Sequence, residues 1–403
     1  MLTKHLVLLS FACVVIAALL ASFVNPSLVK LAYHKRILDN PNARKLQKRP
    51  VPVIGGMSVF VAATGAILLA NFVVGTNTLF IPVVCLIAMF FVGIIDDMVG
   101  ISYVVKFAFQ VVLVFLLWYF GFRIDTLGGI LGIHRLGLAP SLVLSLLAGV
   151  GLINAMNLID GVDGLASGLG VYSGLICGII FLLHYDAVYA VLSMSFVGAL
   201  LPFFVHNVFS KKYKMFIGDS GSLVLGMLAY LFTCRIIHLP YLYLIDDYSI
   251  SMMLAIYAVP VYDTLRVMTF RILHGHSPFL PDKTHLHHVF ISMKYPHVLV
   301  TCIILTISVI IFLIWFGLTW LELSITWTTV ISVTISAMIV WLIYIVIDRQ
   351  RFFGTRQYAR QVALARYRTK RISRFYYRMQ CLVDRKHYPA PWKDEKKTNA
   401  LSD

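Results

Sequence analysis

The sequence predicts an all-α, polytopic integral membrane protein with about 11 transmembrane helices. Of its 403 residues, 60% are hydrophobic and only 13% are charged, which is far more apolar than a soluble domain of this length requires. The apolar residues gather in runs of about 20, the length that crosses a bilayer. Most basic residues fall in alternate connecting segments, as in a chain that crosses a membrane repeatedly.

The first apolar run resembles a signal peptide, because Lys4 and His5 precede it. That run is long and a strongly basic loop follows it, so we expect an uncleaved span. The predicted spans cover residues 6–24, 53–74, 79–95, 104–120, 141–158, 168–184, 187–205, 222–238, 251–268, 298–318 and 324–347.

The distribution of Lys and Arg predicts the orientation. Of 34 such residues, 30 lie in segments that follow odd-numbered spans, and the other four are Lys4, Arg123, Arg135 and Arg235. Because positive residues mark the cytoplasmic side, we expect the N-terminus outside and the C-terminus in the cytoplasm. One predicted cytoplasmic loop, at 155–167, carries acidic residues and no basic ones.

Two regions follow from this pattern: a multi-span membrane domain over 1–348 and a basic cytoplasmic tail over 349–403. The tail stretch 356–380 mixes basic and apolar residues at near-helical spacing. It predicts either an amphipathic helix on anionic membrane lipids or a positive-inside signal with some helix. The net charge of +16 is concentrated in this tail and after the first span, which favours a membrane partner and no nucleic acid. Nothing in the tail points to catalysis.

Acidic residues gather at the predicted cytoplasmic ends of the spans. Ionisable groups near membrane depth are costly and therefore indicate function. A single carboxylate there is explained by a helix cap in water, but five acidic motifs on one face are not. The motifs are "GIIDDMVG" with Asp96 and Asp97, "NAMNLIDGVDGLASG" at 154–168, "FIGDSGS" with Asp219, the segment around Asp263, and "PDKTHLHH" with Asp282.

The second motif cannot present all its polar groups from one helix. These groups, spaced three residues apart, are Asn154, Asn157, Asp160 and Asp163. Each step of three residues turns a helix by about 300°, so the first and last would face opposite ways. Gly161 and Gly164 favour a break. We therefore expect a helix that ends near Leu158 and a tight loop that turns Asp160 and Asp163 toward one cavity.

Carboxylate and amide oxygens suit Mg²⁺, with Mn²⁺ as a second candidate, and Mg²⁺ in proteins is often shared with substrate phosphates. The sequence offers cationic partners for phosphate in Lys106, the run 44–49 and the lysines at 211, 212 and 214. Free N–H groups around Asp219 could also hold an anion. The histidines His285, His287 and His288, with Asp282, allow either a zinc site or contacts to a pyrophosphate. Their spacing does not match the usual zinc patterns, which favours phosphate.

The ordered set "DNPNARK…VPVIGG", "DDMVGIS" with Lys106, "NAMNLIDGVDGLASG", "FIGDSGS" and "SPFLPDKTHLHH" resembles the polyprenyl-phosphate N-acetylhexosamine-1-phosphate transferases, over about residues 39–290. The "HLHH" motif and the span count are similar to the WecA-type branch, which uses undecaprenyl phosphate and GlcNAc-1-phosphate or a related sugar phosphate. The MraY-type branch, which acts on UDP-MurNAc-pentapeptide, has ten spans and three adjacent histidines. The chain departs from many relatives at Gln47, where they carry His, and in its longer tail.

The resemblance implies a role for each matching residue. Asn157 and Asp219 correspond to the Mg²⁺ ligands, and the Asp96–Asp97 pair to carboxylates with either a base role or a metal or structural role. The implied catalytic residues are Asp96, Asp97, Lys106, Asp160, Asp163, His285, His287 and His288. The implied substrate-binding residues are Arg44, Lys45, Asn154, Asn157, Gly218, Ser220 and Asp282.

The resemblance also implies the activity. The lipid phosphate would attack the β-phosphorus of a UDP-N-acetylhexosamine, most simply UDP-GlcNAc, and UMP would leave. The setting implied is the cytoplasmic face of a bacterial inner membrane, with a homodimer suggested by relatives. Two alternatives from other classes are a transporter for a nucleotide sugar or ion, which should place its acids near the bilayer midplane, and a scaffold anchored through its tail.

Overall fold

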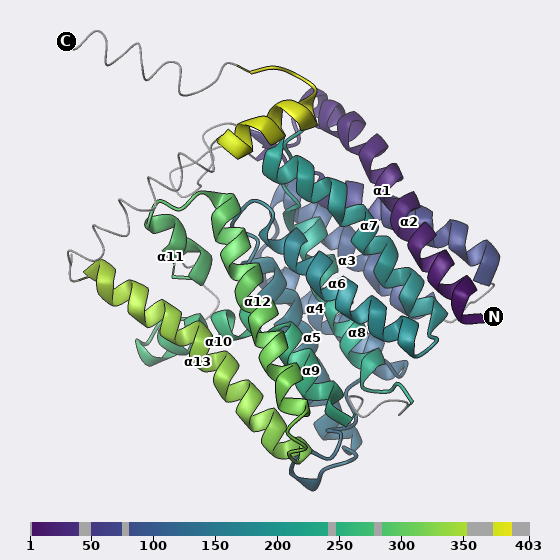
Figure 1. The fold of residues 1–403 in the computed structure, drawn as a ribbon, viewed down its shortest axis with the longest axis vertical. Helices are drawn as coiled ribbons and strands as arrows, with labels where there is room; N and C mark the ends of the chain where they lie inside the picture. Colours follow the sequence, from purple (N-terminus) through teal and green to yellow (C-terminus); the bar gives the residue numbers. More distant parts are fainter. Residues whose placement is uncertain are drawn as a thin grey trace.

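The computed structural model describes residues 2–39, 50–74, 80–240, 247–277, 284–352 and 374–388. These ranges form one helical bundle (Figure 1). Its helices are α1 Leu2–Lys35, α2 Gly55–Val74, α3 Phe80–Val99, α4 Tyr103–Tyr119, α5 Leu138–Leu158, α6 Leu165–Leu183, α7 Ala187–Phe209, α8 Gly218–Ile236, α9 Ser249–Ile256, α10 Ala258–Leu273, α11 Leu286–Ser292, α12 His297–Thr319 and α13 Ile325–Phe352, with a short 3-10 turn η1 at Ile130–Gly132.

Helix α8 lies at the centre of the bundle. Nearly all its side chains are buried, and it packs against α3, α5 and α2, while α7 packs against α1, α6 and α2. A second group holds α9, α10, α12 and α13. In that group the buried Trp315 donates from Nε1 to Ser251 Oγ at 2.9 Å. Because α8 begins with the "GDSGS" motif, this arrangement places Asp219 at the centre of one end of the bundle.

Two very short strands pair at the same end of the bundle. Strands β1 Leu38–Asp39 and β2 Val51–Pro52 pair antiparallel, with Leu38 opposite Pro52 and Asp39 opposite Val51. Val53 then forms a parallel bridge with Phe216, and Gly55 N donates to Phe216 O at 2.9 Å. The segment after α1 is thereby held against the segment that leads into α8.

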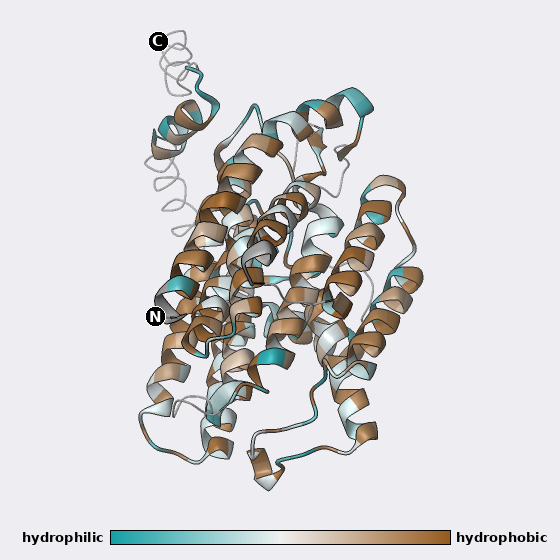
Figure 2. Cartoon of the chain, turned by 90° about the vertical axis from the view of Figure 1, so that its right-hand side faces the viewer, coloured by the Kyte–Doolittle hydropathy of each residue, from teal (hydrophilic) through white to brown (hydrophobic). Residues whose placement is uncertain are grey.

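Each of the 11 predicted apolar stretches coincides with a helix or helix pair. Seven helices (α1, α3, α5, α6, α7, α12 and α13) are long and apolar enough to cross a membrane, and the pair α9 and α10, bent by 72°, makes an eighth candidate. Helices α2 and α4 give shorter apolar segments. Apolar colour runs along the lengths of the helices in Figure 2. An all-α, multi-span membrane protein is therefore confirmed, while the count of 11 stays a prediction.

The bend between α9 and α10 lies inside the protein. It falls at the buried Tyr257, as expected if the backbone groups freed by a broken helix must be shielded from lipid. The predicted tail helix over 356–380 lies mostly outside the described residues. From 374 to 384 the chain is helical, and this part lies at the top of Figure 1, beside the end of α7.

Candidate active site

A cavity of about 1450 Å³ opens at the end of the bundle where α8 begins. Its walls combine segments that are far apart in the sequence, namely the end of α1, the β1–β2 pair, the end of α3, the α5–α6 loop, the α7–α8 loop and α11–α12. Of the predicted site residues, those lining it are Asp96, Asp97, Asp160, Asp163, Gly218, Asp219 and His288. Three of the five acidic motifs thus supply carboxylates to one cavity. Asp263 is not part of this lining, and Asp282 lies outside the described residues.

Asp97 caps the first turn of α8. Its Oδ1 accepts from Asp219 N at 2.8 Å and its Oδ2 from Ser220 N at 3.0 Å. Gly218 permits this approach because its φ of 67° is a left-handed value, and a Cβ there would lie 2.6 Å from Asp97 Oδ2. A carboxylate at a helix N-terminus satisfies free N–H groups and the helix dipole. Asp97 thus positions Asp219 directly.

Lys106 joins Asp96 to Asp219. Its Nζ lies 2.5 Å from Asp96 Oδ2 and 2.6 Å from Asp219 Oδ2. Asp96 Oδ1 also accepts from Ile101 N at 2.8 Å, which fixes the turn between α3 and α4. The two carboxylates that Lys106 contacts line the cavity, whereas the side chain of Lys106 does not.

The two asparagines of the α5 motif have different hydrogen-bond partners. Asn157 Nδ2 donates to Asp219 Oδ1 at 2.6 Å and to Ser222 Oγ at 2.8 Å. Asn154 instead donates to Gln110 Oε1 at 2.6 Å and lies outside the cavity lining. Asn157 is thus part of the cluster around Asp219. The predicted substrate contact of Asn154 stays a prediction.

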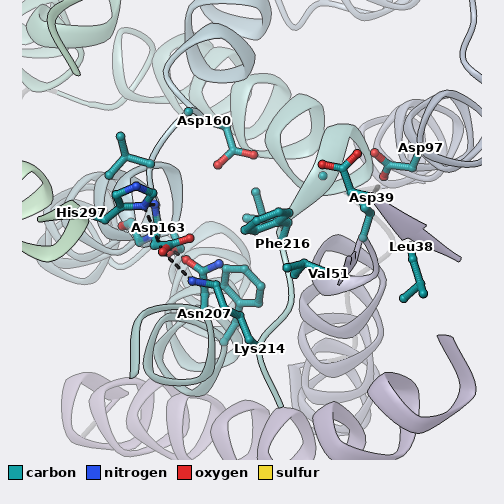
Figure 3. Close-up of a pocket in the computed structure, with 18 of the residues that line it drawn as sticks. Leu38, Asp39, Val51, Asp97, Asp160, Asp163, Asn207, Lys214, Phe216 and His297 are labelled. Carbon is teal, nitrogen blue, oxygen red and sulfur yellow. Dashed lines mark hydrogen bonds and ion pairs between the residues drawn. The ribbon is translucent and has the colours of Figure 1, made fainter. Parts of the chain in front are cut away.

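Helix α5 ends at Leu158, and the loop after it turns both aspartates into the cavity, as predicted (Figure 3). Asp163 Oδ2 lies 2.6 Å from Lys214 Nζ and 3.0 Å from His297 Nδ1. Burial alone would raise the pKa of Asp163, but the hydrogen bond to His297 and the charge of Lys214 outweigh it and hold the pKa below its usual value. Asp163 is therefore ionised at neutral pH.

Asp160 has the opposite electrostatic setting. Its carboxylate points into the cavity (Figure 3) and has no ion pair among the described residues. Burial raises the pKa of Asp160 well above its ordinary value, and the nearby charges of Asp219, Asp97 and Asp163 add to the effect. An uncompensated carboxylate facing other acids is suited to receive a cation.

The three histidines His285, His287 and His288 have different surroundings. His285 Nδ1 lies 2.9 Å from Asp263 Oδ2, and this buried Asp263 also pairs with Arg266 at 2.8 Å. His287 is buried, and neither ring nitrogen has a hydrogen-bond partner among the described residues. Burial and the neighbouring histidines hold its pKa well below the usual value, so the ring is neutral. Only His288 lines the cavity.

The remaining predicted residues divide into two groups. Ser220 is buried and contributes its backbone N–H to Asp97. Arg44, Lys45 and Asp282, together with Gln47, lie outside the described residues.

Sequence reasoning missed several groups that complete the walls. Asp39, Asn207, His297 and Tyr388 all line the cavity. Asp39 opens the quoted "DNPNARK" motif, so that motif was a usable signal for it. Asn207 accepts from Gly164 N at 2.5 Å, and His297 begins α12, but both are isolated polar residues within apolar segments. No pattern in the sequence separates them from ordinary helix-end residues.

The sequence profile of glycosyl transferase family 4 matches residues 79–237. One relative is the decaprenyl-phosphate N-acetylglucosaminephosphotransferase of Mycobacterium tuberculosis, 33% identical over 315 residues, which span 72% of this chain and 77% of the relative. The chain belongs to glycosyl transferase family 4. Another relative is the undecaprenyl-phosphate alpha-N-acetylglucosaminyl 1-phosphate transferase of Escherichia coli K12, 29% identical over 272 residues, or 66% of this chain and 72% of that protein. The enzyme of the same name from Salmonella typhi is 30% identical over 266 residues, 64% of this chain and 70% of that protein.

The match to glycosyl transferase family 4 covers part of the site. Residues 79–237 include the Asp97 cap, the Lys106 bridge, the α5–α6 loop and the start of α8. The histidine segment, α12 and the tail lie beyond it, although they supply His288, His297 and Tyr388 to the same cavity. Part of the cavity wall is therefore assembled from segments outside the range that the family profile matches.

The oxygens around Asp219 fit a hard divalent cation. Asp219 and Asn157 lie in direct contact at 2.6 Å, and Asp160 offers the uncompensated carboxylate across the cavity. Within the described ranges, no three His, Cys, Asp or Glu side chains gather into a ready metal cluster. Mg²⁺ does not require one, because it is often held by one or two carboxylates with waters and phosphate oxygens completing its shell.

Proposed function

We propose that this protein transfers N-acetylglucosamine-1-phosphate from UDP-N-acetylglucosamine to undecaprenyl phosphate and releases UMP. The names of its relatives support the polyprenyl phosphate acceptor and the GlcNAc-phosphate group. The product would be undecaprenyl-pyrophosphoryl-GlcNAc, the lipid-linked sugar that begins a cell-envelope glycan. The identity of the sugar is the part of the proposal that the site determines least, and other UDP-N-acetylhexosamines are the alternative donors.

The observation that carries this proposal is the cavity itself. Segments far apart in the sequence place carboxylates, an amide and cationic side chains around one space at the end of an apolar bundle. A lipid phosphate can reach such a site from the membrane while a nucleotide reaches it from water. Cations are needed there because both reacting groups are anions that repel each other.

In the proposed mechanism, a phosphate oxygen of the lipid forms a bond to the β-phosphorus, and the bond from that phosphorus to the UMP oxygen breaks. Mg²⁺ held by Asp219 and Asn157 would supply charge neutralisation for the pyrophosphate. Lys106 keeps Asp219 and Asp96 in place, and Asp97 fixes the start of α8. A strong base is unnecessary because a phosphomonoester with a second pKa near ~6 is largely a dianion at neutral pH.

The setting we propose is a bacterial inner membrane, with 11 spans, an external N-terminus and the cavity on the cytoplasmic face. The distribution of Lys and Arg supports this orientation. A homodimer is proposed on the resemblance alone. The relatives named above are transferases, and no observation favours the transporter alternative. The scaffold alternative does not explain why carboxylate, amide and ammonium groups from distant segments gather around one cavity.

The test is UMP release by the purified chain given undecaprenyl phosphate, Mg²⁺ and a panel of UDP-sugars. We expect release with UDP-GlcNAc, loss on chelation of the metal, and a loss of about 10²–10³-fold in Asp219→Asn, the size typical when one stabilising group is removed. Asp125→Asn is the matched control, because Asp125 pairs with His238 outside the cavity. A folded protein that releases no UMP with any sugar would rule the proposal out.

A further inference from the structure

The basic C-terminal tail reaches the cavity. Its described part, 374–388, has a helix that ends at Asp384, and Tyr388 beyond it lines the cavity wall. Tyr376 Oη donates to Val208 O at 2.5 Å, and Phe209 at the end of α7 packs its ring against Phe375 and Tyr376. The sequence suggested only a lipid-binding or topological role for this region, so the contact needs its own explanation.

Asp384 binds the start of the α7–α8 loop. This buried carboxylate accepts from Ser210 Oγ, from Lys211 N at 2.9 Å and from Lys212 N at 3.3 Å. Ser210 Oγ in turn accepts from Tyr213 N at 2.7 Å. A carboxylate that accepts several N–H groups fixes a loop firmly, because charge-assisted hydrogen bonds are about twice as strong as neutral ones. The tail therefore sets the path of the loop that leads into α8.

The same loop carries two ammonium groups that line the cavity. Lys214 is paired with Asp163, whereas Lys211 has no carboxylate partner among the described residues. Its Nζ lies 5.0 Å from the centre of the Tyr388 ring, a cation–π distance, and Tyr388 Oη donates to Asp384 Oδ2 at 2.8 Å. Asp384 and Tyr388 thus hold both the backbone and the side chain of Lys211.

We propose that the tail segment 374–388 positions Lys211 at the cavity mouth, where its ammonium binds the phosphate of a substrate. Asp384 and Tyr388 act through Lys211 and are positioning residues. The inference rests on the proposed transferase function and adds to it a role for the tail. The phosphate belongs either to the polyprenyl phosphate or to the nucleotide sugar, and the kinetic experiment distinguishes the two.

The experiment uses the full-length chain in lipid nanodiscs and varies each substrate at saturation of the other. We expect Asp384→Asn, Tyr388→Ala and Lys211→Gln each to raise the KM of the same substrate about tenfold, the effect of losing one hydrogen bond to a charged group. The kcat should stay nearly unchanged, since the reacting atoms are not touched. Tyr388→Phe keeps the ring over Lys211 and should retain most of the wild-type affinity.

Two controls separate positioning from a general loss of structure. Arg385→Gln removes an exposed charge from the same turn of the tail and should leave both KM values unchanged. Asp384→Asn added to Lys211→Gln should raise KM no further, because coupled residues are not additive. Additive effects, a loss confined to kcat, or variants that match Arg385→Gln would overturn the inference.

The inference can fail independently of the proposed function. Equilibrium binding of undecaprenyl phosphate and of UDP-GlcNAc, measured by calorimetry on the same variants, requires no turnover. Weaker binding of one ligand in the tail variants supports the role of Lys211 even if no UMP is released. Active variants with unchanged dissociation constants would remove the tail inference and leave the transferase proposal standing.

Discussion

Asp97 illustrates how an assigned role depends on where the oxygens point. Both of its oxygens accept backbone N–H groups of α8, from Asp219 and Ser220. Sequence reasoning left open whether this carboxylate takes a proton or orients its neighbours. The two donors belong to the turn that carries Asp219, so both carboxylate oxygens are used to hold that turn. The contacts favour positioning.

The substitution Asp97→Asn tests this role. The amide keeps one acceptor oxygen, so one N–H of the first turn loses its partner at a cost of about 1 kcal/mol in folding free energy. We expect UMP release to fall by the same factor at every pH at which the protein stays folded. The measurement is a pH–rate profile of kcat beside the wild type. A rate that recovers as the pH rises would instead assign Asp97 as the base.

The carboxylate of Asp160 is expected to lower the folding stability of the metal-free protein while serving the proposed reaction. Its pKa is raised in the folded protein from about 3.9 in an unfolded chain, so the folded state binds this proton more tightly. Stability is therefore lost as the pH rises from the unfolded value through the raised folded value. At neutral pH, which is above the unfolded value, the raised pKa of Asp160 therefore destabilises the metal-free protein.

We expect Asp160→Asn to raise the thermal midpoint of the metal-free protein near neutral pH, while lowering its UMP release. The gain should shrink on acidification and vanish below the unfolded pKa, where both forms are neutral. The measurement is thermal denaturation in detergent with a chelator at several pH values. A gain that does not change with pH would contradict the electrostatic explanation.

At the scale of elements, the α5–α6 loop packs against α11, which fixes its conformation. His287 packs its neutral ring against Gly161, and a Cβ at this glycine would lie 2.2 Å from Nε2 of the ring. On its other side, Gly164 N donates to Asn207 of α7 and Thr301 Oγ1 of α12 donates to Asp163 O at 2.8 Å. Three helices therefore hold the turn that presents Asp160 and Asp163.

We expect Gly161→Ala to displace this loop or the histidine ring, because overpacking a buried contact costs about 1–3 kcal/mol. If the same cost falls on the transition state, UMP release should fall about 5- to 150-fold, at about 1.4 kcal/mol for each factor of ten. The matched control is Gly151→Ala in α5, where an added Cβ meets nothing within 4 Å. If both variants behaved like the wild type in activity and thermal midpoint, the loop would not depend on this contact.

At the scale of the whole molecule, the cavity lies at one end of an apolar bundle. The segments lining it are those that the charge pattern assigns to the cytoplasm, whereas Arg135, which precedes α5, is assigned outside. The proposed donor, a charged nucleotide sugar, cannot cross the apolar core of a bilayer unaided. The orientation of the bundle therefore decides whether the proposed reaction can occur.

This orientation is tested by cysteine labelling in a variant whose six native cysteines are replaced. We expect Arg135→Cys to react with a membrane-impermeant maleimide in intact spheroplasts. Arg385→Cys, in the tail, should react only after the membrane is opened. The reverse pattern would place the cavity outside and contradict the proposed reaction.

The sequence alone determined the fold class and the helical segments, and its family resemblance indicated that Asn157 and Asp219 act together. Long apolar runs in lipid form helices, because every backbone N–H and C=O group must find its hydrogen-bond partner within the segment. The helical period showed that Asn154 and Asp163 would face opposite ways on one helix, and two glycines indicated the turn after Leu158. These are local properties, and local patterns are sufficient to read them.

Only the tertiary structure decided what each side chain contacts across the bundle. The pairing of Asp163 with Lys214 and His297, the division of work among the histidines, and the docking of Asp384 on the α7–α8 loop join residues far apart in the chain. Such contacts depend on how helices pack and which ends meet, and the hydrophobic pattern leaves those choices open. The tail could not be connected with the site from its composition, because a basic amphipathic stretch has the same pattern whether it binds lipid or protein.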